Sequence, residues 1–185
     1  MSTILISPPS VEPVTLAEAK HDCRVTTSDD DAKIGRLITA VRESIEHDIG
    51  VSLAPQTWEL RLDAFPAGEI KLLNGPVTAI VSIKYTDPSG AEQTVSPTDY
   101  TVVSDSQGDW AAPAYGLSWP DTLDSANAVR VRYTAGYADG ECPDAIRQRI
   151  LTLVVDYYDN PGGLSPKSAQ AAQFNDRLLD RYRVY

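Results

Sequence analysis

The chain has only two cysteines and two histidines among its 185 residues. Cys23 and Cys142 are too few for a zinc set and indicate no disulfide framework, so we expect both as small buried hydrophobic side chains. A metal site or catalytic triad would depend on His21 or His47 with distant partners. Residues two apart on a helix lie on different faces, so His21 and Cys23 would not meet on one ion. We therefore predict no metal, no cofactor and no catalytic group, with both histidines at the surface or at helix ends.

Long apolar runs and an excess of positive charge are also missing. No segment approaches the roughly 20 apolar residues of a membrane span, and the N-terminus lacks the pattern of a secretion signal. We therefore expect a soluble protein, made in the cytoplasm, with no membrane partner. The 16 basic residues face 26 acidic ones, for a net charge of −10. Phosphate contacts need clustered Lys and Arg, so tight binding to nucleic acid is disfavoured, whereas an acidic surface lets DNA pass without trapping it.

Motifs that would fix a reaction are absent as well. The sequence has no phosphate-binding glycine loop and no nucleophile elbow. The carboxylates of Asp29–Asp31 fit the first turn of a helix, where the helix dipole favours them, better than a metal site. A hydrolase could use Glu59 with Asp63. Both share a strand face with Arg61, opposite apolar residues, and this pattern predicts a solvated face instead.

One segment changes its hydrophobic period within a few residues. Residues 128–134 alternate apolar side chains with arginines, Gly136 permits a positive φ, and Pro143 suits the beginning of a helix. Apolar residues then recur at helical spacing on one face, at Ile146, Ile150, Leu153, Val154 and Tyr157. The sequence therefore predicts a strand that leads into a helix at 143–159, which packs on a second apolar stripe between Ile34 and Ile45.

The remaining pattern predicts an α+β fold. Thr15 and Glu18 have the spacing of a capping box, a longer helix opens at Thr26–Ser28, and Gly50 suits its left-handed end, so helices are expected within about 15–50. Alternating residues indicate an antiparallel β-meander of about five or six strands at about 56–134, with a surface loop between 104 and 125. We expect a helical layer of two N-terminal helices and one C-terminal helix, as a single domain at 1–163 with a tail at 164–185.

The tail carries apolar and basic residues after a break at Asn160–Gly163. They are Phe174, Arg177, Leu178, Leu179, Arg181, Tyr182, Arg183 and Tyr185. Such anchors are typical of a segment that becomes ordered on binding a groove of another subunit, and the arginines suit acidic partners. Packing of the tail against its own domain is an equally open alternative.

Several short segments occur in a recognisable order. They are Pro-Val-Thr-Leu-Ala-Glu-Ala-Lys at 13–20, Asp29–Asp31, Gln-Thr-Trp-Glu-Leu at 56–60, Ala-Gly-Tyr at 135–137, and the end of the tail from Leu178 to Arg183. With the strand, turn and helix described above, this series resembles the head–tail connector (adaptor) proteins of long-tailed bacteriophages and of related prophages or gene-transfer particles. The resemblance spans nearly the whole chain.

The resemblance implies a structural virion protein and no enzyme. About twelve copies would form a ring at the head–tail joint. The ring would attach to the portal protein and provide a platform for the stopper or tail-completion protein. DNA would pass through it without sequence-specific binding, and the tail would bind the portal or a neighbouring subunit. Before assembly the protein would reside in the host cytoplasm.

A different class of function stays open beside this one. Trp110, Trp119 and nine tyrosines would suit a monomeric β-rich module that binds carbohydrate or peptide. Such a module would change its tryptophan fluorescence on binding its ligand.

Overall fold

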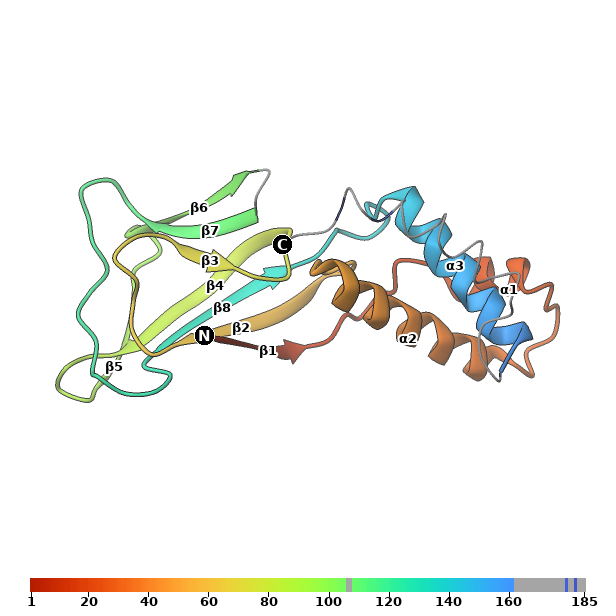
Figure 1. Cartoon of the computed structure of the whole chain (residues 1–185), viewed down its shortest axis with the longest axis horizontal. Coiled ribbons are helices and arrows are strands. Elements are labelled where there is room, and N and C mark those ends of the chain that lie inside the picture. Colours follow the sequence, from red (N-terminus) through yellow and green to blue (C-terminus); the bar gives the residue numbers. More distant parts are fainter. Residues whose placement is uncertain (106–107, 162–178, 180–181, 183–185) are drawn as a thin grey trace. The chain divides into compact units, whose positions relative to one another are not determined.

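The computed structural model describes residues 1–105, 108–161, 179 and 182, and the chain divides into two compact units (Figure 1). The β unit consists of Met1–Ser10 and Pro55–Gly136, and the helical unit of Val11–Ala54 and Tyr137–Tyr185. The chain therefore begins in the β unit, enters the helical unit, returns to the β unit and ends in the helical unit. The expected division between residues 163 and 164 stays a prediction.

The helical unit contains three helices within residues 11–54 and 137–161: α1 at Leu16–Asp22, α2 at Asp31–Ile49 and α3 at Asp144–Asp159. Thr15 and Glu18 make the predicted capping box before α1, in which the Glu18 backbone N–H donates to Thr15 Oγ1 over 3.2 Å. Gly50 ends α2 in the left-handed conformation, with a φ of 70°. Both helix-terminal signals in the sequence are thus confirmed.

The beginning of α2 differs from the prediction. The helix begins at Asp31, with Asp30 as its N-cap residue, and not at Thr26–Ser28. The Tyr158 hydroxyl donates to Asp30 Oδ2 over 2.6 Å, and Lys20 pairs with Asp31 over 2.5 Å. These contacts with other helices fix the place where α2 begins, and neighbouring sequence does not reveal them.

The three helices share one apolar core. Its buried side chains include Val14, Ala19, Ile34, Ile38, Val41, Ile45, Ile49, Ile146, Ile150 and Val154. The predicted packing of the α3 stripe on the α2 stripe is therefore confirmed for most residues. Cys142 is buried in this core and Cys23 packs partly against it, as expected of small hydrophobic side chains. Burial raises the pKa of the Cys142 thiol to about 11.

Tyr157 is the exception on α3, since 38% of the residue is exposed. The expected inward position of this side chain is wrong. The neighbouring Tyr158 lies on the core side at this end of the helix, where it also contacts Lys33 Nζ, 4.1 Å from the ring centre. In the last turn of α3, Tyr158 therefore belongs to the apolar face and Tyr157 does not.

The described residues of the β unit form eight strands in two antiparallel sheets. The five-stranded sheet has the order β1-β2-β8-β4-β5, and the three-stranded sheet has the order β3-β7-β6 (Figure 1). The bounds are β1 Ser2–Ser7, β2 Gln56–Leu62, β3 Ile70–Leu72, β4 Val77–Thr86, β5 Glu92–Thr94, β6 Tyr100–Asp105, β7 Gly108–Pro113 and β8 Val129–Ala135. Strands far apart in the sequence pair directly, as β2 does with β8.

The two sheets enclose the core of the β unit. Inward residues come from β2, β4 and β8 on one side and from β3 and β7 on the other: Leu60, Ile70, Leu72, Ile83, Ala111, Val129, Val131, Tyr133 and Ala135. Tyr133 is fully buried, and its hydroxyl donates to the Leu73 carbonyl over 2.8 Å. Because residues alternate along a strand, the polar residues of β2 and β8 lie on the outer face of the five-stranded sheet.

The α+β class is confirmed, and two strands were not indicated by the sequence pattern. β1 precedes the prolines of the N-terminal segment, where Thr3, Ile4 and Ile6 provide a short β-branched signal. β7 lies inside the expected surface loop at 104–125, so that prediction is wrong for Gly108–Pro113. Gly, Asp and Pro disfavour strands in isolation, and β7 forms because β3 and β6 pair with both of its edges. None of the described helices is long and apolar enough to cross a membrane.

Candidate functional site

The outer face of the five-stranded sheet carries a cluster of charged side chains from four neighbouring strands. We call this cluster the charged face, and it consists of Glu59 and Arg61 on β2, Lys84 on β4, Glu92 on β5, and Arg130 and Arg132 on β8. The strand order β2-β8-β4-β5 places them side by side. Two carboxylates thus face four cations, and each carboxylate is shared by two of them.

The first ion cluster centres on Glu59. Its Oε1 lies 2.8 Å from Arg61 Nη2, and its Oε2 accepts from Arg132 Nη2 over 2.8 Å. The strand register makes this contact possible, because Glu59 is paired directly with Arg132 across β2 and β8. Glu59 is only 4% exposed. The predicted solvated face is therefore wrong for this residue, since the two arginines cover its carboxylate.

The second ion cluster centres on Glu92. Its Oε1 lies 2.9 Å from Lys84 Nζ, and its Oε2 pairs with Arg130 Nη2. These hydrogen bonds and charges lower the pKa of the Glu92 carboxyl. About half of the Glu92 side chain is exposed, so this cluster is more open to solvent than the first.

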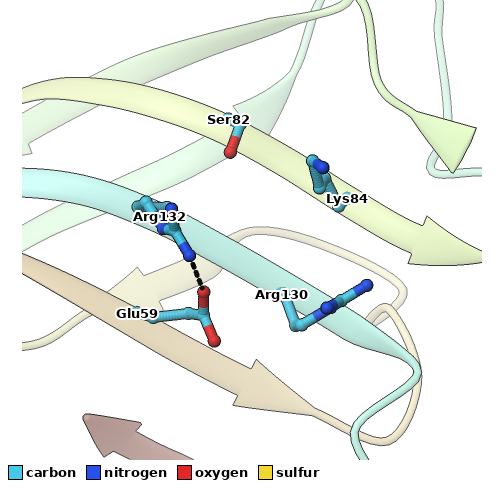
Figure 2. A pocket seen from close by; sticks show the side chains of 5 residues that line it. All are labelled: Glu59, Ser82, Lys84, Arg130 and Arg132. Atoms are coloured by element: carbon cyan, nitrogen blue, oxygen red, sulfur yellow. Dashed lines mark hydrogen bonds and ion pairs between the residues drawn. The ribbon is translucent and has the colours of Figure 1, made fainter. Parts of the chain in front are cut away.

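A small pocket separates the two ion clusters. It has a volume of about 80 Å³ and is lined by Glu59, Ser82, Lys84, Arg130 and Arg132. Figure 2 shows these side chains on β2, β4 and β8, with Arg132 reaching toward Glu59. Arg132 Nε is buried and has no hydrogen-bond partner within the part of the chain that the structure describes. The pocket therefore offers cationic donors whose charge the two carboxylates only partly balance.

The electrostatics of Glu59 do not fit acid catalysis. Burial by itself would raise the pKa of Glu59, but the hydrogen bonds and charges of Arg132 and Arg61 outweigh burial and lower it. A general acid needs the opposite shift. Asp63 is engaged elsewhere, because its Oδ1 accepts from the Asn127 backbone N–H over 2.8 Å. The pair therefore lacks the properties that the hydrolase hypothesis requires.

Ion pairing of Glu59 predicts a pH-dependent stability of the β unit. The pKa of Glu59 is lower in the folded chain than the ordinary value of 4.5 for a glutamate. Ionised Glu59 therefore stabilises the folded state above pH 4.5, and this contribution is lost as the pH falls through the lowered pKa. At neutral pH, Glu59→Gln should reduce the free energy of unfolding by about 2 kcal/mol, because two partly buried arginines lose their shared carboxylate. Under acidic conditions the free energies of unfolding of the variant and the wild-type chain should become equal.

Urea unfolding followed by tryptophan fluorescence measures this effect in the β unit, which contains all three tryptophans. Glu92→Gln is the matched control, because it also removes a carboxylate shared by two cations but at an exposed position. It should cost less than Glu59→Gln. A Glu59→Gln penalty that is equal at neutral and acidic pH would contradict the prediction.

One of the two tryptophans expected in a carbohydrate or peptide site packs against other residues of the β unit. Trp119 stacks on Phe65 with ring centres 5.0 Å apart, and its indole N–H donates to the Gly68 carbonyl over 2.7 Å. A pocket of about 290 Å³ lies beside Trp119 and is also lined by Tyr85. Trp110 lies on β7 and is partly exposed. Phe65 therefore covers one face of Trp119, and only the other face is available for stacking on a ligand.

Most of the predicted tail residues lie outside the described residues: Phe174, Arg177, Leu178, Arg181, Arg183 and Tyr185. The two described ones belong to the helical unit. Leu179 is 4% exposed and joins the core of the three helices, and Tyr182 packs against that core. These contacts favour packing on the chain's own unit for Leu179 and Tyr182. The role of the tail in partner binding stays a prediction.

Within the described residues, no group of three or more His, Cys, Asp or Glu side chains could hold a metal ion. Asp29–Asp31 lies at the beginning of α2, where Asp30 and Asp31 contact Tyr158 and Lys20. His21 and His47 are exposed in the last turns of α1 and α2, as predicted.

The charged face was not predicted from the sequence. The available signal was the alternation of Arg130 and Arg132 with valines in β8. Its significance depends on Glu59, Lys84 and Glu92, which lie far from β8 in the sequence, so only the strand order brings the cluster together.

The fold is similar to that of several chains in solved structures. No curated protein gives a significant sequence match. A chain of the neck of an empty GTA particle computed with C6 symmetry is similar with a TM-score of 0.79 and 21% identity, over 100% of this chain and 96% of that one. A chain of the virion of a native gene transfer agent (GTA) particle gives 0.77 and 20%, with the same coverage. A chain of the neck of a native GTA particle with C12 symmetry gives 0.67 and 19%, over 98% and 96%.

These identities establish likeness of fold, and the family follows from a separate comparison. The family model described as phage gp6-like head-tail connector protein matches residues 13–107, which is more than half of the 185 residues. The matched span contains α1 and α2 and most of the strands of the β unit. The resemblance drawn from short sequence segments is thereby confirmed, and this chain belongs to the phage gp6-like head-tail connector protein family.

Proposed function

We propose that copies of this chain form a ring at the head–tail joint of a phage or gene-transfer particle. The ring attaches to the portal protein and provides a platform for the stopper or tail-completion protein. DNA passes through the ring without sequence-specific binding. The role is structural and not catalytic, in keeping with the family to which the chain belongs. Before assembly, the chain resides in the host cytoplasm.

The observation that carries this proposal is the likeness to neck chains over the whole length of the protein. The similar chains come from necks computed with C6 and C12 symmetry. Such symmetry describes closed rings, in which every subunit presents one surface to the next subunit and receives a different one. A ring of about twelve copies is therefore the state that we propose for this chain.

The net charge of −10 supports a conduit more than a DNA-gripping protein. Proteins that hold DNA tightly present clustered cations to the phosphates. Here all four cations of the charged face already pair with carboxylates of the same face. DNA would therefore pass without being held.

Contact with the portal is assigned to the C-terminal tail. Leu179 and Tyr182 hold part of this segment on the helical unit. We assign the contact with the portal or a neighbouring subunit to the remaining residues of the set: Phe174, Arg177, Leu178, Arg181, Arg183 and Tyr185.

The proposal predicts that charge reversal in the tail weakens docking. Arg177→Glu, Arg181→Glu and Arg183→Glu, introduced together, should reduce the affinity for the cognate portal by about tenfold or more, because the introduced glutamates would meet an acidic partner surface as like charges. Electron microscopy of mixtures of portal and chain measures the fraction of portals that carry a ring. Leu179 is left unchanged, since its replacement would disturb the helical core.

Lys167→Glu provides the matched control, because it reverses a charge in the same segment but outside the predicted set. It should leave docking unchanged. Equal docking of the triple variant and the wild-type chain would reject the role of the tail. Failure of the wild-type chain to decorate its portal would reject the proposed function itself. A monomer in the absence of the portal is compatible with it, because the portal can act as the template for the ring.

A further inference from the structure

We propose, on the basis of the proposed ring, that the pocket between the two ion clusters receives an aspartate or glutamate side chain from a second copy of this chain. The charged face would then be one half of the contact between neighbouring subunits. The other half would be an acidic part of the next subunit's surface. The proposal follows from the incomplete charge balance of the pocket, its donors and its size.

The charge balance of the pocket is the first observation. Glu59 and Glu92 together face Arg61, Lys84, Arg130 and Arg132. The charged face thus keeps two positive charges more than it has negative ones. A carboxylate that enters the pocket would lie between the cations of both clusters. Its hydrogen bonds to these cations would be stronger than hydrogen bonds between neutral groups.

The donors of the pocket are the second observation. Lys84, Arg130 and Arg132 line it together with Ser82, whose hydroxyl can also donate. The side chains of Lys84, Arg130 and Arg132 are 44%, 37% and 44% exposed, so their accessible cationic nitrogens can donate to an entering carboxylate.

The pocket volume of about 80 Å³ limits the size of the occupant. This volume is enough for a small polar group, such as a carboxylate with its methylene group. The pocket therefore suits one acidic side chain.

Charge complementarity identifies the second copy as the occupant. The β unit has one basic residue outside the charged face, Lys71. The unit has eight further carboxylates that take no part in the ion pairs of the charged face: Asp63, Glu69, Asp87, Asp99, Asp105, Asp109, Asp121 and Asp124. The charged face thus has a net positive charge, whereas the rest of the β unit has a net negative charge by its residue count. In a ring, one surface of each copy meets a different surface of the next, so opposite charges can face each other at every contact.

DNA is the other polyanion that a neck protein meets, and it fits less well. A duplex would approach a chain whose net charge is −10, and this repulsion opposes binding of phosphates to one small cationic pocket. A neighbouring subunit can instead present one carboxylate in a fixed position.

Zero-length cross-linking tests the contact directly. Rings are assembled on the cognate portal from equal parts of unlabelled and isotope-labelled full-length chain, and a carbodiimide then joins lysine amines to adjacent carboxylates. We expect peptides in which Lys84 of one isotope is joined to an Asp or Glu of the other. Coupling of Lys84 to Glu92 within one chain gives pairs of a single isotope and serves as the internal reference. Lys84 coupled only within its own chain, or to a portal peptide, would overturn the proposal.

Charge reversal provides a second test with a matched control. Arg130→Glu should reduce the affinity between copies by about tenfold, and Arg130→Lys should retain most of it. Lys71→Glu reverses the one basic residue of the β unit outside the charged face and should leave assembly unchanged. Tryptophan fluorescence and circular dichroism establish that each variant is folded. If Arg130→Glu does not fold, the cross-linking result decides.

The outcomes separate this inference from the proposed function. Equal ring formation on the portal by the wild-type chain and by folded Arg130→Glu would reject the inference and leave the proposed function intact. Loss of binding to duplex DNA in Arg130→Glu, with ring formation retained, would identify DNA as the occupant and also reject it. Failure of the wild-type chain to form rings on its portal would reject the proposed function and the inference together.

Discussion

Replacing Arg42 with leucine is expected to lower the free energy of unfolding of the helical unit by about 3 kcal/mol. Arg42 lies on α2 and is 3% exposed. Its Nε donates to Glu12 Oε2 over 2.7 Å, and its Nη1 donates to Glu46 Oε2 over 2.5 Å. Burial alone would lower the pKa of Arg42, but the charges of Glu46 and Glu12 outweigh burial and raise it. The substitution removes this cation from two carboxylates that the fold holds in place.

The expected loss lies toward the lower end of values for broken buried ion pairs, because Glu12 and Glu46 keep some contact with solvent, at 28% and 13% side-chain exposure. Urea unfolding followed by circular dichroism of the helices measures it. Glu43→Gln is the control, since Glu43 is mostly exposed and lies 3.4 Å from Arg42 Nη2. This change should stay within about 0.5 kcal/mol. Equal effects of the two substitutions would contradict a structural role for the Arg42 network.

Replacing Ile150 with alanine is expected to destabilise the helical unit by about 3 kcal/mol, within the usual range for large-to-small core substitutions. Ile150 is fully buried on α3, among residues such as Ile34 and Ile45 of α2. The substitution removes apolar surface and leaves a cavity that the packed helices can only partly close. The same unfolding experiment measures the loss.

Two further variants calibrate this prediction. Ile150→Val removes one methyl group and should cost about 1 kcal/mol. Tyr157→Ala lies on the same helix at a position that is 38% exposed, and it should cost less than Ile150→Ala. A Tyr157→Ala penalty as large as that of Ile150→Ala would contradict the exposed position of Tyr157 on α3.

Local signals in the sequence predicted a large part of the secondary structure. The capping box of Thr15 and Glu18, the left-handed Gly50 and the alternation in residues 129–135 all involve residues within a few positions of each other. Their physics is local, because capping, positive φ and alternation act within one turn or one strand. These elements were therefore predicted close to their observed bounds.

β7 shows where local signals fail. Gly108–Pro113 has a composition that is typical of a loop. In the folded chain Asp109 is buried, its Oδ2 accepts from the Val77 backbone N–H over 2.8 Å, and its Oδ1 accepts from Ser104 Oγ over 2.5 Å. The strand exists because other segments supply its partners.

The sequence by itself determined the α+β class, the apolar stripes of α2 and α3, the burial of the cysteines and the membership of the connector family. The tertiary structure alone decided the charged face. Glu59 looks like a solvated carboxylate in the sequence, and it becomes a buried one because the register of β2 and β8 sets it against Arg132. A period of two fixes which face of a strand a residue occupies. Which charges meet on that face depends on the order and register of strands that are distant in the chain, and these are set when the whole β unit packs its core.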